Sequence, residues 1–231
     1  ISMGTEGMKA SLVSREVIAD SIETVTFGES MDGLVVVAAC DKNMPGALMS
    51  MARLNVPSVF VYGGAILPGS FNGNDINIQD MFEAIGAYSQ GKISHDELVE
   101  MERVACPGEG ACSGMFTANT MSSAIEALGM SIPGAASIPA VDPRINTPAY
   151  DVGSIMYKLL ENDLKPRDIM TYEAFENAIR VVLSMGGSTN AVLHLLAIAH
   201  EAEVDISIDD FDRLSRDTPY LTDLRPGGRF V

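Results

Sequence analysis

One stretch of the chain constrains the fold more than any other, because an apolar run ends directly in a thiol, a carboxylate and an amine. Residues 35–40 (VVVAAC) are continuously apolar, and Asp41 and Lys42 follow them. A continuous apolar run between turn-forming residues is typical of a strand buried on both faces, as in a parallel sheet. The sequence therefore predicts a fully buried strand that ends at reactive side chains.

The residues after this run predict a strand-helix-strand unit. A proline and a glycine lead into residues 47–54, which have the composition of a helix, and proline is tolerated in a first helical turn. Residues 58–62 (SVFVY) form a second apolar run. We therefore predict an α/β fold, a three-layer α/β/α arrangement with a mostly parallel sheet. Ligands of such sheets bind at the carboxyl ends of the strands, where Cys40, Asp41 and Lys42 would lie.

Composition narrows the class of protein. With 231 residues, of which 47% are hydrophobic, the chain can bury a core without help from disulfides or metals. It carries 15 Lys and Arg against 31 Asp and Glu, and a net charge of -16 repels phosphate backbones, so we expect no nucleic-acid partner. The absence of a long apolar run or a signal-peptide pattern predicts a soluble protein without a membrane partner. Three cysteines favour reduced thiols.

A second informative stretch is residues 105–121 (ACPGEGACSGMFTANTM). Its glycines and proline exclude regular structure up to about Ser113, and the apolar spacing that follows is typical of a helix ended by Gly129. Cys112 is therefore expected on a Gly-rich loop at the amino end of a helix. We expect the helix dipole there to stabilise a thiolate, which is the form that binds a metal.

The rest of the chain reads as mostly helical, with an exposed loop at residues 68–75. Apolar spacing and capping residues predict helices at residues 14–28, 77–90, 94–104, 150–161, 171–185 and 190–202, with another from 207 onward. We find no internal repeat and no linker that would force a second domain.

Alternative interpretations of the reactive residues remain open from residue chemistry alone. Cys40 could be a small buried hydrophobe beside a surface pair of Asp41 and Lys42. Alternatively, a soft thiol and a hard carboxylate could serve neighbouring sites for two different metals. Cys106 and Cys112 are six positions apart, which fits no common zinc or ferredoxin spacing.

The remaining candidates favour structural roles. His95 is expected to be solvated, and His194 and His200 lack the spacing of a helical metal pair, so core or surface roles are favoured. Met44, Met49 and Met51, close to the first motif, are expected to fill the core. The sequence has no Gly-x-Ser-x-Gly motif, so nothing in it indicates the nucleophilic serine of a hydrolase triad.

Three motifs together resemble the dihydroxy-acid dehydratase and phosphogluconate dehydratase family. They are residues 40–46 (CDKNMPG), the block 105–121, and residues 186–194 (GGSTNAVLH). The residues at positions 4–8 (GTEGM) and 191–196 (AVLHLL) resemble the dihydroxy-acid dehydratase branch of this family more than the sugar-acid branch.

The resemblance implies an iron-sulfur cluster held by three cysteines beside a magnesium ion. Cys40 and Cys112 match two cluster ligands, and a 2Fe-2S cluster is favoured over a 4Fe-4S cluster. Asp41 matches a Mg²⁺ ligand, and Lys42 matches a lysine that the family carbamylates, which converts an ammonium donor into an anionic oxygen ligand. The third cysteine, further Mg²⁺ carboxylates and a serine base are expected outside residues 1–231.

The resemblance also implies the reaction, which is dehydration of 2,3-dihydroxy-3-methyl carboxylates to branched-chain 2-keto acids in valine and isoleucine biosynthesis. Residues 1–231 would then be an N-terminal domain that binds the iron-sulfur cluster and magnesium. This domain would be truncated at both ends and inactive alone. The full-length protein would be a homodimer or larger oligomer in the bacterial cytoplasm or an organelle. The alternatives are a sugar-acid dehydratase acting on a compound such as 6-phosphogluconate, a non-catalytic iron-sulfur or thiol sensor, and a plain α/β scaffold.

Overall fold

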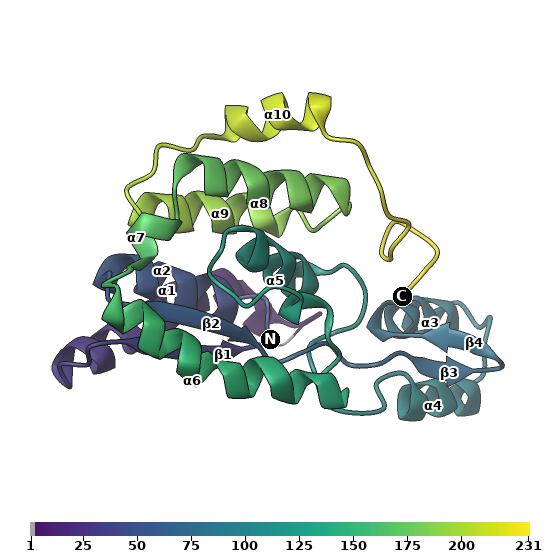
Figure 1. The fold of residues 1–231 in the computed structure, drawn as a ribbon. Coiled ribbons are helices and arrows are strands. Elements are labelled where there is room, and N and C mark those ends of the chain that lie inside the picture. Colours follow the sequence, from purple (N-terminus) through teal and green to yellow (C-terminus); the bar gives the residue numbers. More distant parts are fainter. Residues whose placement is uncertain (1–2) are drawn as a thin grey trace.

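The computed structural model describes residues 3–231 and confirms the α/β fold. Strands β1 (Leu34–Ala38) and β2 (Ser58–Tyr62) lie side by side in parallel, joined by helix α2 (Asn43–Leu54) (Figure 1). The register places Leu34 opposite Ser58 and Ala38 opposite Tyr62. Both strands therefore end at the same edge, as the strand-helix-strand pattern predicts.

Isolated parallel bridges extend the two-stranded sheet beyond its named strands. Phe60 bridges to Ser131, and Ala65, just after β2, bridges to both Ala111 and Pro139. The segments before and after α5 (Thr117–Ala127) therefore both meet Ala65, just beyond the carboxyl end of β2. The mostly parallel sheet is confirmed.

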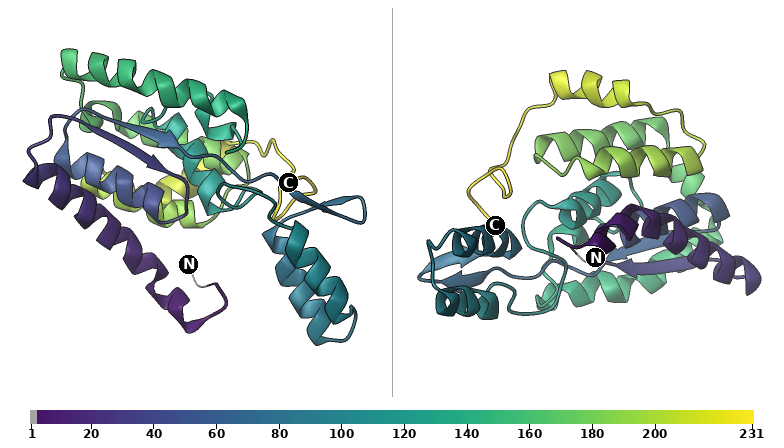
Figure 2. Two further views of the ribbon diagram at one scale, coloured as in Figure 1. Left: turned by 90° about the horizontal axis from the view of Figure 1, so that it is seen from below. Right: turned by 180° about the vertical axis from the view of Figure 1, so that it is seen from behind.

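Helices cover both faces of the sheet, as predicted. Helix α6 (Asn146–Glu161) packs against β2 on one face, and α2 packs against both strands on the other (Figure 2). Helices α1 (Ser11–Gly28) and α9 (Asn190–Glu201) in turn pack against α2. Helix α2 is therefore enclosed from three sides, and residues 44–52 are all buried.

The prediction that the first strand is fully buried is wrong. Val35 and Val37 are 41% and 67% exposed, whereas Leu34, Val36 and Ala38 pack against the core. Successive side chains of a strand point to opposite faces, and only one face of β1 is covered within the described chain. Strand β2 is buried at all five positions.

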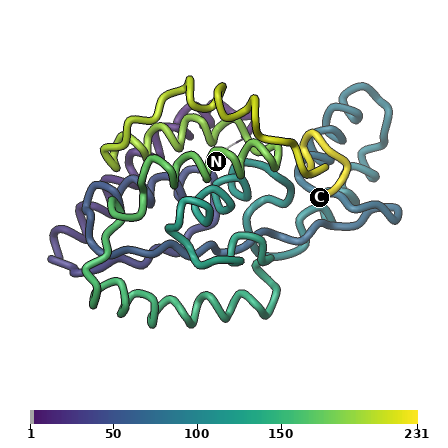
Figure 3. The backbone as a smooth tube through the Cα atoms, turned by 45° about the horizontal axis from the view of Figure 1, so that its top comes forward, coloured from purple at the N-terminus to yellow at the C-terminus, as the bar shows by residue number. Residues whose placement is uncertain are grey.

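The main core lies between the sheet and a layer of C-terminal helices. Helices α7 (Pro166–Ile169), α8 (Tyr172–Ser184) and α10 (Ile208–Asp217) lie with α9 on the side of the sheet opposite α6 (Figure 3). The fully buried large side chains include Met44, Met49 and Met51, so the prediction that these methionines fill the core is confirmed.

The predicted exposed loop at residues 68–75 is instead a hairpin. Strands β3 (Gly69–Phe71) and β4 (Asn74–Ile76) pair antiparallel, and Asn72 and Gly73 between them have φ of 50° and 78°. Positive φ at both central residues matches the twist of the flanking strands, and Asn-Gly is the strongest short-range signal for such a turn. That signal identifies the hairpin from sequence.

Further helices complete the chain. The hairpin packs with α3 (Ile78–Ser89) and α4 (His95–Val104), and short 3-10 turns occur at η1 (Glu6–Ala10), η2 (Ala135–Ser137) and η3 (Pro143–Ile145). The predicted start of the first helix at residue 14 is wrong, because α1 starts at Ser11 and the Ser14 hydroxyl donates to the Ser11 carbonyl at 2.6 Å. In residues 3–231, no helix is long and apolar enough to span a membrane.

Candidate functional site

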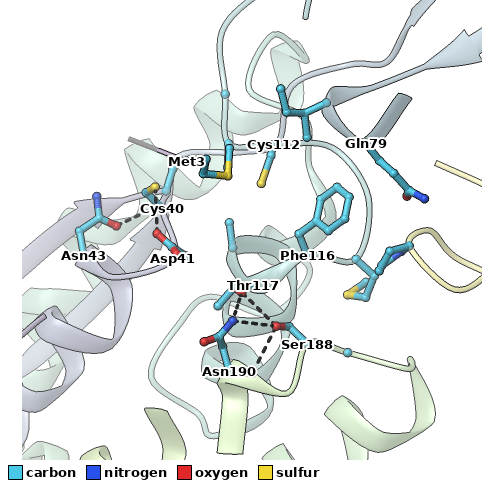
Figure 4. A pocket seen from close by; sticks show the side chains of 18 of the residues that line it. Met3, Cys40, Asp41, Asn43, Gln79, Cys112, Phe116, Thr117, Ser188 and Asn190 are labelled. Carbon is cyan, nitrogen blue, oxygen red and sulfur yellow. Dashed lines mark hydrogen bonds between the residues drawn. The ribbon is translucent and has the colours of Figure 1, made fainter. Parts of the chain in front are cut away.

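A pocket of about 1160 Å³ opens at the carboxyl end of β1. Cys40 and Asp41, which follow the strand, lie on its wall, and Cys112 reaches it from the Gly-rich loop before α5 (Figure 4). Residues that are 72 positions apart in sequence (112 − 40) thus face one cavity. The size is that of a small-molecule site.

The carboxylate of Asp41 lies between a thiol and an amine. Its Oδ1 accepts from the Cys40 thiol at 3.5 Å, and its Oδ2 accepts from the Lys42 Nζ at 3.2 Å. The Cys40 backbone N–H donates to Asn43 Oδ1 at 2.8 Å, which pins the turn between β1 and α2. The side chain of Lys42 is 7% exposed and that of Asp41 is 31% exposed, so the pair is partly shielded from water.

Two side chains hold the loop that carries Cys112. The Asn119 amide of α5 donates to the carbonyls of Cys112 at 2.9 Å and Gly114 at 2.6 Å. The Tyr62 hydroxyl, at the end of β2, donates to Asn119 Oδ1 at 2.6 Å and so orients that amide. The sheet therefore positions Cys112 through one buried tyrosine and one asparagine.

Backbone pairing holds the same loop from its other side. The Ala111 N–H donates to the Gly64 carbonyl at 2.9 Å, and the Ile66 N–H donates to the Ala111 carbonyl at 2.7 Å. Gly110 has φ of 128°, and a Cβ there would lie 2.4 Å from the Ile66 nitrogen. The close approach of the two backbones requires glycine at this position.

The electrostatics of the pocket differ from the sequence-based expectation. Burial, followed by the charges of Cys40 and Asp41, raises the pKa of Cys112 to about 11. Burial and the Asp41 charge also raise the pKa of Cys40. The expectation of a thiolate stabilised by a helix end is wrong, because α5 begins at Thr117, beyond the loop. Thiolates in this pocket require a cation to balance them.

A cluster of hydroxyl and amide groups also lines the pocket. Thr117 Oγ1 and Ser188 Oγ lie 3.0 Å apart, and the Asn190 amide donates to them at 3.1 and 3.3 Å (Figure 4). The sequence patterns predict only the start of a helix at residue 190 and no ligand-binding role for these side chains. The available signal was the motif at residues 186–194, which contributes to the family resemblance.

Two glycines shape the start of the motif at residues 186–194, beside α5. A Cβ on Gly187 would lie 2.6 Å from Thr120 Cγ2, and the Ser188 N–H donates to Thr120 Oγ1 at 3.0 Å. Gly186 has φ of 61°, and a Cβ there would meet the Tyr220 ring at 2.5 Å. Glycine at position 187 therefore allows the loop before α9 to approach α5, and glycine at position 186 allows the left-handed backbone beside Tyr220.

His194 is a buried residue close to the site. It is 0% exposed, and its Nδ1 lies 3.2 Å from Arg15 Nη1. Burial, followed by the charges of Lys42 and Arg15, lowers the pKa of His194 to about 3. The ring is therefore neutral at physiological pH. His95 and His200 are exposed, so the expected core or surface roles of the histidines are confirmed.

The donors in the pocket suit metals but do not complete a site by themselves. Within the described residues, no three or more His, Cys, Asp or Glu side chains are placed to hold one ion, and all three cysteines are free. Of these cysteines, Cys40 and Cys112 line the pocket, whereas Cys106 does not. Thiols suit iron and a carboxylate suits magnesium, so the donors fit both groups that the resemblance implies.

The fold and the pocket define an α/β protein with a thiol-bearing ligand pocket at the carboxyl end of its parallel strands. Residues 1–231 match, over their whole length, the family described as dihydroxy-acid/6-phosphogluconate dehydratase N-terminal. The chain belongs to this family.

Curated relatives agree with the family assignment. The chain is 58% identical over all 231 residues to proteins named dihydroxy-acid dehydratase 2 in Staphylococcus saprophyticus and dihydroxy-acid dehydratase in a Synechococcus species, and covers 41% of each. It is 57% identical to a protein named dihydroxy-acid dehydratase in Nitrosospira multiformis and covers 42% of it. The chain thus spans about two-fifths of the length of these relatives.

Proposed function

We propose that this chain forms the N-terminal catalytic part of a hydro-lyase that dehydrates 2,3-dihydroxy-3-methyl carboxylates to branched-chain 2-keto acids. The observation that carries the proposal is the convergence of Cys40, Asp41 and Cys112 on one pocket at the carboxyl end of β1. The relatives named dihydroxy-acid dehydratase support the same substrate class.

The residues present fit an iron-sulfur cluster and Mg²⁺. Cys40 and Cys112 hold a cluster, of the 2Fe-2S type, together with a further cysteine outside this chain. Asp41 and a carbamylated Lys42 hold Mg²⁺. The pocket brings two thiols and one carboxylate together, and the Lys42 ammonium binds only the carboxylate among them. Ionised thiols would repel the Asp41 carboxylate, and a bound metal cation would offset that repulsion.

When bound, these groups supply Lewis-acid stabilisation of the departing 3-hydroxyl and of the negative charge that develops at the substrate carboxylate and C2. The chain's own residues position the reactants. The Lys42 Nζ donates to Asp41 Oδ2 at 3.2 Å, so the two groups that would hold Mg²⁺ lie together in the turn between β1 and α2. No catalytic base is assigned to this chain, and the proton at C2 is removed by a residue of the C-terminal domain.

The cluster of Thr117, Ser188 and Asn190 orients the substrate. Its hydroxyls and amide offer both donors and acceptors to the substrate's oxygens. These side chains are held by one another, so little conformational entropy is lost when they bind a ligand. Removal of the Ser188 hydroxyl, as in Ser188→Ala, is expected to raise KM more than it lowers kcat.

The direct test is chemical analysis together with turnover in the full-length enzyme. Iron and acid-labile sulfide should co-purify with the protein, and dihydroxyisovalerate should be converted to its keto acid. Asp41→Asn should abolish most turnover while leaving the iron content in place, because Asp41 is assigned to Mg²⁺. A protein that binds neither iron nor sulfide would refute the proposal. Iron and sulfide without any turnover would indicate a sensor role instead, and wild-type turnover in Asp41→Asn would refute the assignment of Asp41 to Mg²⁺.

A sugar-acid dehydratase is the second candidate, because the family description includes 6-phosphogluconate. The two candidates differ in the substrate that gives the higher kcat/KM. Faster turnover of 6-phosphogluconate than of dihydroxyisovalerate would select the second.

We also propose a homodimer or larger oligomer in the bacterial cytoplasm or an organelle. Helix α1 supports an additional interface, since Val13, Val17 and Val25 share one side of it and are 61%, 60% and 58% exposed. Sedimentation of the full-length protein as a monomer would refute the oligomer.

A further inference from the structure

Three helices meet around His194. Arg15 comes from α1, Lys42 precedes the first turn of α2, and His194 lies on α9. The helices α1 and α2 approach closely at Gly46, where a Cβ would lie 2.8 Å from the Arg15 carbonyl oxygen. At the far end of α2, Arg53 binds Asp20 of α1 and Glu201 of α9 at 2.8 Å each. The position of His194 relative to Lys42 is therefore held at both ends of α2.

The contact with Arg15 determines the tautomer of His194. A guanidinium has only donors, so Arg15 Nη1 donates to Nδ1 across 3.2 Å, and Nδ1 must be the unprotonated nitrogen. The neutral imidazole then carries its proton on Nε2. That Nε2–H is buried and has no hydrogen-bond partner among residues 3–231. Buried donors are rarely left without an acceptor, and such a group calls for an explanation.

Lys42 is the charged group that acts most strongly on this ring. After burial itself, the Lys42 charge lowers the pKa of His194 most, ahead of Arg15 at 3.2 Å. Lys42 is 6% exposed, so its charge is little screened by water. An ammonium has donors and no acceptor, so an unmodified Lys42 cannot bind the Nε2–H.

Carbamylation changes this relationship. The lone pair of a neutral Lys42 Nζ attacks the carbon of CO₂, an N–C bond forms, one C=O π pair moves to oxygen, and an N–H proton leaves to water. The product is an anionic carbamate whose oxygens accept hydrogen bonds. It removes the cation beside the ring and supplies the acceptor that Nε2–H lacks.

We infer that His194 is a positioning residue that donates its Nε2–H to the carbamate of Lys42; this inference rests on the proposed function. Arg15 fixes the His194 tautomer that carries the proton on Nε2. One carbamate oxygen then faces His194, and the other remains for the metal. The modified lysine is thereby stabilised and oriented by the protein before substrate binds.

The experiment measures carbamate formation directly. The full-length protein at a fixed Mg²⁺ concentration is titrated with ¹³C-bicarbonate, and the ¹³C signal that is absent in Lys42→Arg reports the carbamate. His194→Asn keeps an amide near the Nδ1 position but loses the Nε2 donor, whereas His194→Gln retains a donor near Nε2. His200→Asn, at an exposed position on the same helix, is the matched control.

The expected result is a rise of about tenfold in the half-saturating bicarbonate concentration for His194→Asn, the effect of losing one hydrogen bond to a charged group. His194→Gln should lie closer to wild type, and His200→Asn should match it. A wild-type value in a folded His194→Asn overturns the inference and leaves the proposed function intact. A wild type without the carbamate signal overturns the assignment of Lys42 itself.

A second measurement covers the case in which the asparagine variant does not fold. In the wild type, the ¹⁵N signals of His194 should report a proton on Nε2, and the Nε2–H signal should shift when bicarbonate is added. In Lys42→Arg it should not shift. A proton on Nδ1, or a signal unchanged by bicarbonate in the wild type, overturns the inference.

Discussion

The contact between Tyr62 and Asn119 offers a sharp test of how the sheet positions Cys112. Tyr62 is 2% exposed, and burial holds its pKa above the usual range, so its hydroxyl stays a donor. Tyr62→Phe removes the 2.6 Å hydrogen bond to Asn119 Oδ1 and leaves a poorly solvated acceptor. The free energy of unfolding should fall by about 1–3 kcal/mol, the cost of leaving a buried polar group without its partner.

Tyr62→Phe should also weaken iron binding at the candidate cluster site. The Asn119 amide holds the carbonyls of Cys112 and Gly114, so a loosened amide frees the loop that presents the thiol. Urea denaturation gives the stability change, and iron content after dialysis gives the effect on the loop. Tyr157→Phe, at a tyrosine that is 68% exposed, is the control and should change neither quantity.

A double-mutant cycle with Asn119→Ala isolates the interaction. Residues in direct contact usually show coupling energies of about 0.5–3 kcal/mol, whereas independent sites show almost none. Additive losses in Tyr62→Phe and Asn119→Ala, together with full retention of iron in Tyr62→Phe, would refute the view that this tyrosine holds the loop through Asn119.

Three further predictions follow from the same geometry. Gly110→Ala should lower the free energy of unfolding by about 3 kcal/mol, because its Cβ would lie 2.4 Å from a backbone nitrogen, whereas Gly86→Ala, in a helix with open space, should be neutral or stabilising in the same urea experiment. Cys112→Ser should lower the iron content of the full-length protein, and Cys106→Ser should not; equal losses would contradict the choice of ligand. The buried His194 should make stability depend on pH: its folded pKa of about 3 lies below the ordinary 6.5, so the unfolded state binds the proton more tightly, and stability should fall as pH drops below 6.5, by up to about 1.4 kcal/mol per pH unit. His194→Asn should flatten this dependence in urea titrations, and an unchanged slope would show that other groups cause it.

Much of the scaffold can be predicted from local sequence patterns. The parallel pair of strands, the helix between them and the pocket at their carboxyl ends follow from two apolar runs and one intervening helix. Some helix starts follow from capping residues, as at Ser94, whose hydroxyl accepts from the Glu97 N–H at 3.1 Å. The hairpin around Asn72 could also have been predicted, because its Asn-Gly turn is a local signal.

By itself, the sequence determined the family, the α/β class and the candidate ligands Cys40, Asp41, Lys42 and Cys112, because these depend on residue identities and on spacing along short segments. Tertiary structure alone decided which distant groups meet. The exposure of Val37, the tyrosine link to the Cys112 loop and the burial of His194 against Arg15 depend on contacts between elements far apart in the chain. Local propensity carries no information about such contacts, because they form only when the helices pack.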